Sequence, residues 1–457
     1  MVIARLLTPA EIGVYSVVMV LLGFVATFRD LGAGQYLVQH KTLNETHLRS
    51  VWTVQLGLGM LFALLTFFSA SAVAGFYSDQ RMHAIMYVLA VNFAVTPFLA
   101  FPNAWLVREM HFGTLAIVRF TGALTHAGVA IGLALSDWGP ISLAWANLAT
   151  TLAGIIAIYL LSNSPAIRWP SLQGIRDVVS FGGRLTLSSL FDTIRAGAPE
   201  LLLGRIQDLA AAGIFSRCQG LVSLFQQLVM SAVGSVALPF FAKENRAGRP
   251  LGPPFLLVAE LLTGLAWPFF GILSLFAYPA IRILYGPQWD AAVEPTRWLA
   301  MAAAVGLPAM ICSSPLIATG HVGKVLKASG FTMILSVIAV LIGVHAGLVQ
   351  IAQYLVVASM ISSIYWIAIA KNLMGFSWGA LSRVALRSFL LAVASVIAPL
   401  VAVLIIGWKP DNLVLACLIV IPGSTVGFIL AAWQLDHALW KEIKRVINLR
   451  KSGNSPD

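Results

Sequence analysis

The stretch Val51–Phe76 reads VWTVQLGLGMLFALLTFFSASAVAGF and holds no Asp, Glu, Lys or Arg over 26 consecutive residues. A helix that crosses the hydrocarbon core of a bilayer needs about 20 apolar residues, so this stretch is long enough to span a membrane. Twelve other stretches are also candidate spans, some of them with a few charged residues. The thirteen predicted spans are 11–29, 51–76, 82–102, 115–135, 139–162, 180–204, 208–238, 254–279, 295–318, 325–345, 348–370, 384–407 and 413–433. The sequence therefore predicts an all-α polytopic membrane protein.

The composition supports this fold class. Of 457 residues, 59% are hydrophobic and only 10% are charged, with a mean hydropathy of +0.87. A soluble domain usually carries about 25% charged residues, so most of this surface must face lipid. The net charge of +11 sits in the short gaps between apolar stretches, which is typical of a membrane protein and not of a nucleic-acid-binding domain.

The basic residues also predict an orientation. We place the tail after residue 433, which contains Lys441, Lys444 and Arg445, in the cytoplasm and alternate the spans backwards. The cytoplasmic side then receives 21 of the 29 Lys and Arg residues and the outer side six, with Arg195 and Arg217 left inside the membrane. This asymmetry matches the positive-inside rule. Thirteen spans put the N-terminus outside, although Met1–Arg5 does not resemble a signal peptide. We therefore expect a first helix to be missing from a fourteen-span protein.

An internal repeat is the next prediction. The segments Arg5–Ser16 and Arg205–Ser216 match at a constant offset of 200 residues, with identical Arg, Gly and Ser; chance similarity in an apolar sequence is the alternative. Both open a span from the outer side, which predicts two six-helix lobes in parallel repeat plus two C-terminal helices. The predicted domains are an N-terminal lobe with a truncated first helix (1–162), a cytoplasmic linker (163–179), a C-terminal lobe (180–370), two additional helices (371–433) and a cytoplasmic amphipathic tail (434–457).

Short motifs in a fixed order resemble the bacterial polysaccharide and O-antigen flippases of the multidrug/oligosaccharidyl-lipid/polysaccharide exporter superfamily. The motif ILYGPQW at Ile283–Trp289 carries the resemblance most strongly. The other segments that carry it are Ala4–Tyr15, Asp30–Gly32, Leu37–Gln39, Leu106–Phe112, Gly204–Arg205, Gly213–Arg217, Leu238–Ala242 and Ala318–His321.

The resemblance implies a function and a location. Such a protein has fourteen helices in two lobes and lies in the bacterial cytoplasmic (inner) membrane. It moves undecaprenyl-diphosphate-linked oligosaccharide units from the cytoplasmic to the periplasmic leaflet for the synthesis of O-antigen, lipopolysaccharide or exopolysaccharide. Its partners are the lipid-linked oligosaccharide and the bilayer, with a polysaccharide polymerase and glycosyltransferases of the same pathway as further candidates.

The predicted span 180–204 carries the candidate substrate site. Arg184, Asp192 and Arg195 fall on one stripe at helical periodicity and, being costly in lipid, should line a water-filled cavity between the lobes. Arg195 and Arg217 are the best candidates to bind a diphosphate, because a guanidinium matches phosphate oxygens. The alternative for Arg195 is an ion pair with Asp192, which can coexist with binding if the pair opens. Glu200 lies on another face and is a candidate for ion coupling or for a place at headgroup level.

Two further patterns are ambiguous. Gly213, Gly220, Gln227, Ser231 and Gly234 form a small and polar stripe in the span 208–238, which predicts either close helix packing or a second cavity wall. Prolines inside or beside spans predict kinks or helix ends; they are Pro97, Pro102, Pro199 and Pro239.

Catalytic and metal-binding motifs are absent from the sequence. It has no HExxH, Asp-x-Asp or GxxxxGK[ST] motif, and its three cysteines stand far apart inside apolar stretches. We therefore predict a transporter that is not an enzyme and has no cofactor and no metal. The alternatives are a multidrug or lipid II exporter with the same fold and a membrane polysaccharide polymerase. The intramembrane arginines favour an anionic cargo over a cationic drug.

Overall fold

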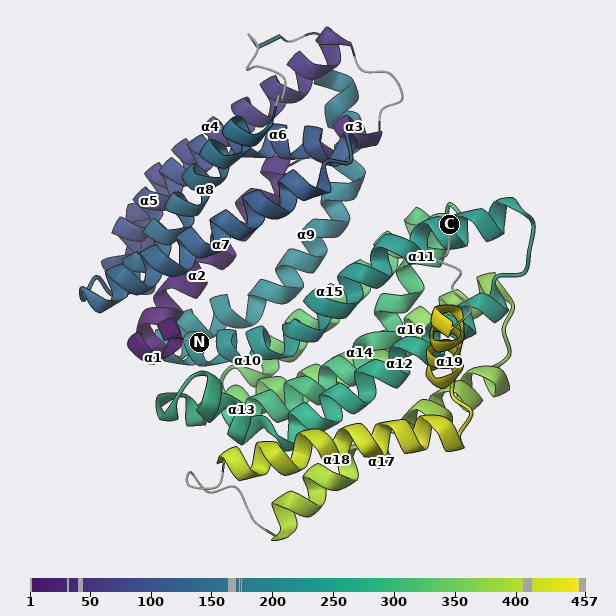
Figure 1. Ribbon diagram of the computed structural model, residues 1–457. Coiled ribbons are helices and arrows are strands. Elements are labelled where there is room, and N and C mark those ends of the chain that lie inside the picture. Colours follow the sequence, from purple (N-terminus) through teal and green to yellow (C-terminus); the bar gives the residue numbers. More distant parts are fainter. Residues whose placement is uncertain are drawn as a thin grey trace. The chain divides into compact units, whose positions relative to one another are not determined.

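The computed structural model describes residues 2–30, 33–39, 44–162, 170–171, 173, 175–405 and 413–451. All regular structure in these ranges is helical, and the chain forms two compact units, Met1–Ser216 (unit 1) and Arg217–Asp457 (unit 2) (Figure 1). Each of the thirteen predicted spans coincides with a helix or with consecutive helices. The predicted all-α fold class is therefore confirmed.

Unit 1 contains nine helices among the described residues, and the start of a tenth. They are α1 (Val2–Leu6), α2 (Pro9–Asp30), α3 (Ala33–Gln39), α4 (Glu45–Tyr77), α5 (Arg81–Val95), α6 (Pro97–Arg108), α7 (Phe112–Leu135), α8 (Ile141–Leu161) and α9 (Ile175–Ile206), followed by the start of α10 (Leu209–Phe225). Asn44 caps α4 with a side-chain hydrogen bond from the His47 N–H at 2.9 Å, as short polar residues do at helix N-termini.

Unit 2 continues from the middle of α10. Its other elements are η1 (Gln226–Met230), α11 (Ser231–Arg246), α12 (Gly252–Leu275), α13 (Ala277–Leu284), η2 (Pro287–Ala292), α14 (Val293–Ala318), α15 (Val322–Gly343), α16 (Leu348–Met374), α17 (Trp378–Ile405), α18 (Leu413–Gln434) and α19 (Ala438–Lys451). Helices α14 and α16 pack side by side, as do α12 with α17 and α17 with α18.

Ten helices in the described part of the chain are long and apolar enough to cross a membrane. The count becomes eleven if α5 and α6, which meet at an angle of 46°, form one broken span. The break falls immediately before Pro97, a residue predicted to kink its span. A second interruption, the π-helical segment η1, lies in the middle of the predicted span 208–238. A π-helix widens the local turn and marks a place where a long helix bends.

The first helices of the two repeated segments cross at their glycines. A Cβ atom added to Gly13 would lie 1.6 Å from the carbonyl oxygen of Leu209, and one added to Gly213 would lie 2.0 Å from that of Pro9. Both pairs are related by the 200-residue offset, so the contact is reciprocal. Only glycine permits two backbones to approach so closely, which explains why both repeats keep it here.

Helix α9 packs along α2 in unit 1. A Cβ atom on Gly197 would lie 2.2 Å from Cγ1 of Val20, and the hydroxyls of Thr193 and Thr27 are 3.0 Å apart. Because of this close packing, the boundary between the units falls after Ser216, whereas the sequence predicts a linker at 163–179 and a C-terminal lobe that starts at 180. Residues 163–169 of that predicted linker lie outside the described residues.

Candidate functional site

An exposed ion pair lies in the middle of α9. The Arg195 Nε atom is 3.8 Å from Oδ1 of Asp192, and the two side chains are 42% and 64% exposed. Arg195 lies roughly 30 Å along the helix from Ile175 and roughly 16 Å from Ile206. The predicted alternative, a pair between these two residues, is thus present. At 3.8 Å and with this exposure, it leaves most donors of the guanidinium available.

Four exposed residues in the middle of α9 occupy one broad face. Ser189, Asp192, Arg195 and Ala196 are exposed, and they follow each other at helical spacing. Four residues after Arg195 comes Pro199, which has no N–H to donate to the carbonyl group of Arg195. This site therefore combines a cation, a carboxylate and a backbone carbonyl that lacks its usual helical donor.

Residues 197–200 of α9 are all buried, so the helix is covered on every side at this level, which includes Glu200. Its neighbours Ala198 and Leu203 are buried with it, and Glu200 itself is only 7% exposed. One residue further on, the carbonyl oxygen of Leu201 accepts a hydrogen bond from the Tyr77 hydroxyl at 3.3 Å. Glu200 therefore lies in a packed part of α9 within unit 1, one turn beyond the exposed Ala196 and about 140° around the helix from Arg195.

Of the two remaining predicted site residues, the structure describes the side chain of Arg217 but not that of Arg184. Arg184 lies in α9, three helical turns before Arg195, but its side chain is outside the described residues. Arg217 belongs to unit 2 and is half-buried. Burial raises the pKa of the Tyr285 phenol, and the charge of Arg217 opposes that rise, so the two side chains are electrostatic neighbours.

Arg217 therefore lies near the motif Ile283–Trp289, which contains Tyr285. The next residue, Cys218, is buried and its thiol donates to the carbonyl oxygen of Ala292 at 3.3 Å, at the end of η2. Arg282 forms a short ion pair with Asp290 in the same region. Arg217 thus lies beside the segment that connects α13 to α14, whereas Arg195 lies far from both ends of α9.

The small and polar stripe of span 208–238 divides into two parts. Gly213 is in close contact with the backbone of α2, which matches the packing interpretation. Gly220 has no neighbouring atom within 4 Å of an added Cβ and, like Gln227, is exposed, which is compatible with a cavity wall. The side chains at Ser231 and Gly234 lie outside the described residues.

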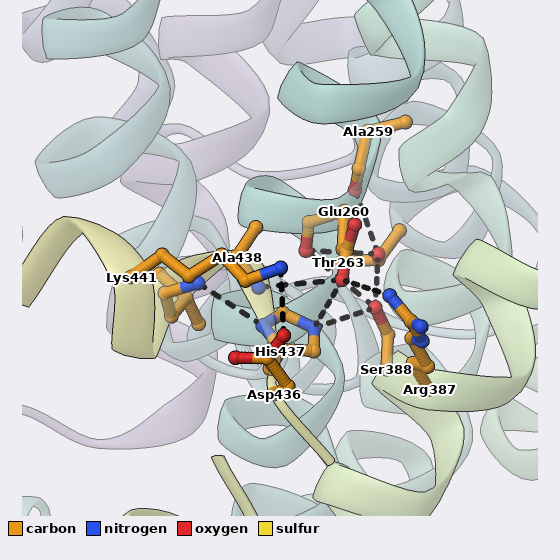
Figure 2. Close-up of polar contacts among 10 residues, drawn as sticks. Ala259, Glu260, Thr263, Arg387, Ser388, Asp436, His437, Ala438 and Lys441 are labelled. Atoms are coloured by element: carbon orange, nitrogen blue, oxygen red, sulfur yellow. Dashed lines mark hydrogen bonds and ion pairs between the residues drawn. The ribbon is translucent and has the colours of Figure 1, made fainter. Parts of the chain in front are cut away.

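A second polar cluster, in unit 2, was not predicted from the sequence (Figure 2). Glu260 on α12, Ser388 on α17 and His437 between α18 and α19 are all buried. The Ser388 Oγ atom is 3.3 Å from Nε2 of His437 and accepts from the Thr263 hydroxyl at 2.8 Å. One signal was available: Glu260 is an acidic residue within the predicted span 254–279, and such residues are rare unless paired.

In the part of the chain that the structure describes, no group of three or more His, Cys, Asp or Glu side chains is placed to hold a metal ion. Cys218 and Cys312 are buried thiols and Cys417 is partly buried.

Comparison with known proteins decides the family. Residues 2–294 match the family described as polysaccharide biosynthesis protein. The chain belongs to this family. The teichuronic acid biosynthesis protein TuaB of Bacillus subtilis (strain 168) is 26% identical over 281 residues, which cover 61% of the chain and 58% of TuaB. The succinoglycan biosynthesis transport protein ExoT of Rhizobium meliloti (strain 1021) is 25% identical over 382 residues, which cover 82% of the chain and 74% of ExoT.

Solved structures show which fold this family member has. The lipid II flippase MurJ in an inward closed conformation matches with a TM-score of 0.75 at 12% identity, over 95% of the chain and 96% of MurJ. An inward-facing multidrug resistance transporter of the MATE family matches with a TM-score of 0.70 at 15% identity, over 82% of the chain and 92% of that protein. The predicted fourteen-helix class of polytopic fold is confirmed, as is the resemblance to polysaccharide flippases.

Proposed function

We propose that this protein flips undecaprenyl-diphosphate-linked oligosaccharide units from the cytoplasmic to the periplasmic leaflet, for the synthesis of an O-antigen or exopolysaccharide. The observation that carries the proposal is the exposed Asp192–Arg195 pair in the middle of α9, in a multi-pass member of a polysaccharide biosynthesis family. The C-terminus is cytoplasmic in this proposal, as the distribution of Lys and Arg predicts.

The exposure of the pair has a physical consequence. A charged side chain at the centre of a bilayer costs about 2.5–3.5 kcal/mol by insertion measurements, so Asp192 and Arg195 do not face hydrocarbon. Water or a polar ligand must therefore reach this face of α9. An anionic diphosphate has the same requirement, because it cannot cross hydrocarbon without counter-charge.

The roles of the residues follow from their chemistry. Arg195 binds the diphosphate, since its planar guanidinium donates two parallel hydrogen bonds to phosphate oxygens. Asp192 holds that guanidinium in place until the substrate enters. Arg184, three turns nearer the predicted cytoplasmic end of α9, contacts the phosphates as the substrate enters, and Arg217 in unit 2 is a separate candidate for a phosphate contact. Glu200, buried in the packed part of α9, takes up the coupling ion.

The energy for transport comes from an ion gradient or from consumption of the product. The sequence has no P-loop, and no catalytic motif suggests that the chain is an enzyme. A polymerase and glycosyltransferases of the same pathway would supply and consume the lipid-linked unit on either side of the membrane.

Deletion of the gene tests the proposed activity directly. We expect the lipid-linked oligosaccharide to accumulate in the cytoplasmic leaflet and the surface polymer to be lost. The leaflet is determined with a membrane-impermeant sugar-oxidising reagent on intact and permeabilised spheroplasts. An oligosaccharide that still reaches the periplasmic leaflet would exclude flipping: a change in polymer length alone would then indicate a polymerase, and altered drug tolerance a multidrug exporter.

A further inference from the structure

The amphipathic helix α19 lies on unit 2 with its charged side outward. Leu439 and Trp440 pack against a core cluster formed by Leu391, Ala431 and Ala432. The basic side chains on the other side of the helix are exposed; they are Lys441, Lys444 and Arg445. Because the apolar side is already covered by α17 and α18, the basic side is the surface that α19 offers to a partner.

Buried polar contacts hold the first turn of α19 (Figure 2). Glu260 Oε1 accepts the N–H of Ala438 at 3.3 Å, which caps the helix with a carboxylate. Nδ1 of His437 accepts the N–H of Leu439 at 3.3 Å. In a neutral imidazole the proton is then on Nε2, which points to Ser388. Three helices, α12, α17 and α19, thus meet at one histidine.

This junction has no spare room. His437 is fully buried, and a Cβ atom on Gly264 would lie 2.4 Å from its Cε1 atom. The start of α19 therefore has a fixed position relative to α12 and α17, and the basic residues on its first two turns have fixed places too.

Cations from both helices gather beside this junction. The pKa of Asp436 is lowered by the hydrogen bond from Lys441 and by the charges of Lys441, Lys444 and Arg387. Arg387 on α17 also lies 3.8 Å from Glu260. Since α19 contributes five Lys and Arg and a single acid, the surface formed by α17 and α19 stays positive after these pairings.

An aromatic residue indicates that this surface lies at headgroup level. The apolar part of α18 ends at Gln434, next to Trp433, which is exposed and lies four residues before His437. Exposed tryptophans concentrate at the membrane–water interface.

We propose that α17 and α19 form a binding site for the phosphate headgroup of an anionic phospholipid, with Arg387, Lys441 and Lys444 as the phosphate ligands. Exposed apolar side chains beside the cations favour a phospholipid over free phosphate as the ligand of this site. Leu386, Phe389 and Leu390 are exposed on α17 within one turn of Arg387, where they contact acyl chains. A free phosphate would use the cations alone, whereas a phospholipid uses both surfaces.

The test is a lipid titration of the purified full-length protein by native mass spectrometry, with phosphatidylglycerol and with zwitterionic phosphatidylcholine. The variant is Lys441→Gln/Lys444→Gln. The matched control is Lys324→Gln/Lys327→Gln, which removes the same charge from exposed positions of the same spacing on α15. Each basic residue near an anionic headgroup contributes about a fivefold gain in binding, so we expect the variant to bind phosphatidylglycerol at least tenfold more weakly and the control to change less than twofold.

Three outcomes would overturn the proposal. Equal losses in the variant and the control would mean that the lipid responds only to net charge. Equal binding of the two lipids by the unmodified protein would remove the role of the headgroup. Displacement of phosphatidylglycerol by millimolar inorganic phosphate or pyrophosphate would identify a free-phosphate site instead. An additional variant, Arg387→Gln, should weaken phosphatidylglycerol binding as well, because this residue comes from the other helix.

Discussion

The polar residues on α9 and those around His437 both lie among apolar helices. They differ in how many of their hydrogen-bonding groups have partners within the protein. Asp192 and Arg195 share one contact at 3.8 Å and remain 64% and 42% exposed. Glu260, Ser388 and His437 are buried and contact each other and the backbone of α19. The first pair keeps hydrogen-bonding capacity for a ligand, and the second cluster uses its capacity to hold helices together.

This difference separates binding from stability. An exposed ion pair contributes about 0–1 kcal/mol to folding, so selection for stability does not explain Asp192 and Arg195 in the middle of a long helix. A buried group that loses its partner costs more, because it keeps its desolvation penalty. Substitutions in the two clusters should therefore affect different properties of the protein.

The largest expected effect is that of Arg195→Ala on transport. We expect export of the lipid-linked unit to fall about a hundredfold while the unfolding free energy changes by less than about 1 kcal/mol, because the lost pair is exposed. Surface polymer in a complemented deletion strain and thermal unfolding of the purified protein measure the two quantities. The control is Arg297→Ala on α14, which also removes an exposed arginine paired with an acid three residues before it. Equal losses of export in both variants would contradict the assignment.

The next largest effect is on packing at the crossing of the repeats. Gly213→Ala places a methyl group 2.0 Å from a backbone oxygen, so we expect a loss of about 3 kcal/mol in unfolding free energy. Gly220→Ala is the control, seven residues along the same helix, where an added Cβ has no neighbouring atom within 4 Å. It should be neutral or stabilise the protein by up to about 1 kcal/mol, since alanine favours helix. A neutral Gly213→Ala would show that the two helices do not cross as described.

Glu260→Ala should reduce stability by about 2 kcal/mol, because it removes the carboxylate that caps α19 and leaves the buried His437 without its acidic neighbour. Transport per folded molecule should stay unchanged. Denaturant unfolding checks the first quantity and export normalised to folded protein the second. Glu442→Ala, which removes an exposed acid on α19 itself, should cost less than about 0.5 kcal/mol. A loss of export without a loss of stability would place Glu260 in the transport pathway.

The smallest effect is a pH dependence of the docking of α19. Burial lowers the pKa of His437 below its ordinary value of 6.5; the charge of Glu260 opposes this shift, and that of Arg387 adds to it. The docked state therefore favours neutral histidine, and its stability is complete above pH 6.5 and declines as the pH falls through the lowered pKa. Hydrogen exchange at residues 438–445, corrected for intrinsic rates, should increase between pH 7.5 and 5.5. His437→Gln should abolish this increase, and an unchanged pH response in that variant would assign it to another group.

Local patterns predicted much of the fold. Apolar length predicted thirteen spans, each of which coincides with one helix or with consecutive helices, and the 200-residue offset indicated a relation between Gly13 and Gly213. The offset did not predict that the two glycines lie in contact, because a repeat shows which positions are equivalent but not which of them pack against each other. The π-helical segment Gln226–Met230 was not predicted, because no hydrophobic periodicity in the sequence distinguishes it from the α-helices on either side.

The candidate sites were predictable to different degrees. Helical periodicity placed Asp192 and Arg195 on one face, since both belong to one helix. Glu260 and His437 are 177 residues apart and meet only because α12, α17 and α19 pack together. The packing of Gly197 and Thr193 on α2 was not predictable for a similar reason, because it depends on contacts between distant parts of the chain.

The central claim is that Arg195 recognises a diphosphate, and the most direct measurement is the binding of undecaprenyl diphosphate relative to undecaprenol. Both ligands are titrated into the purified protein, Arg195→Ala and Arg297→Ala. The unmodified protein and Arg297→Ala should prefer the diphosphate by at least about a hundredfold, and Arg195→Ala should lose most of this preference, because charge-assisted hydrogen bonds to phosphate are stronger than contacts with an alcohol. An unchanged preference in Arg195→Ala would contradict the account, since another group would then bind the phosphates.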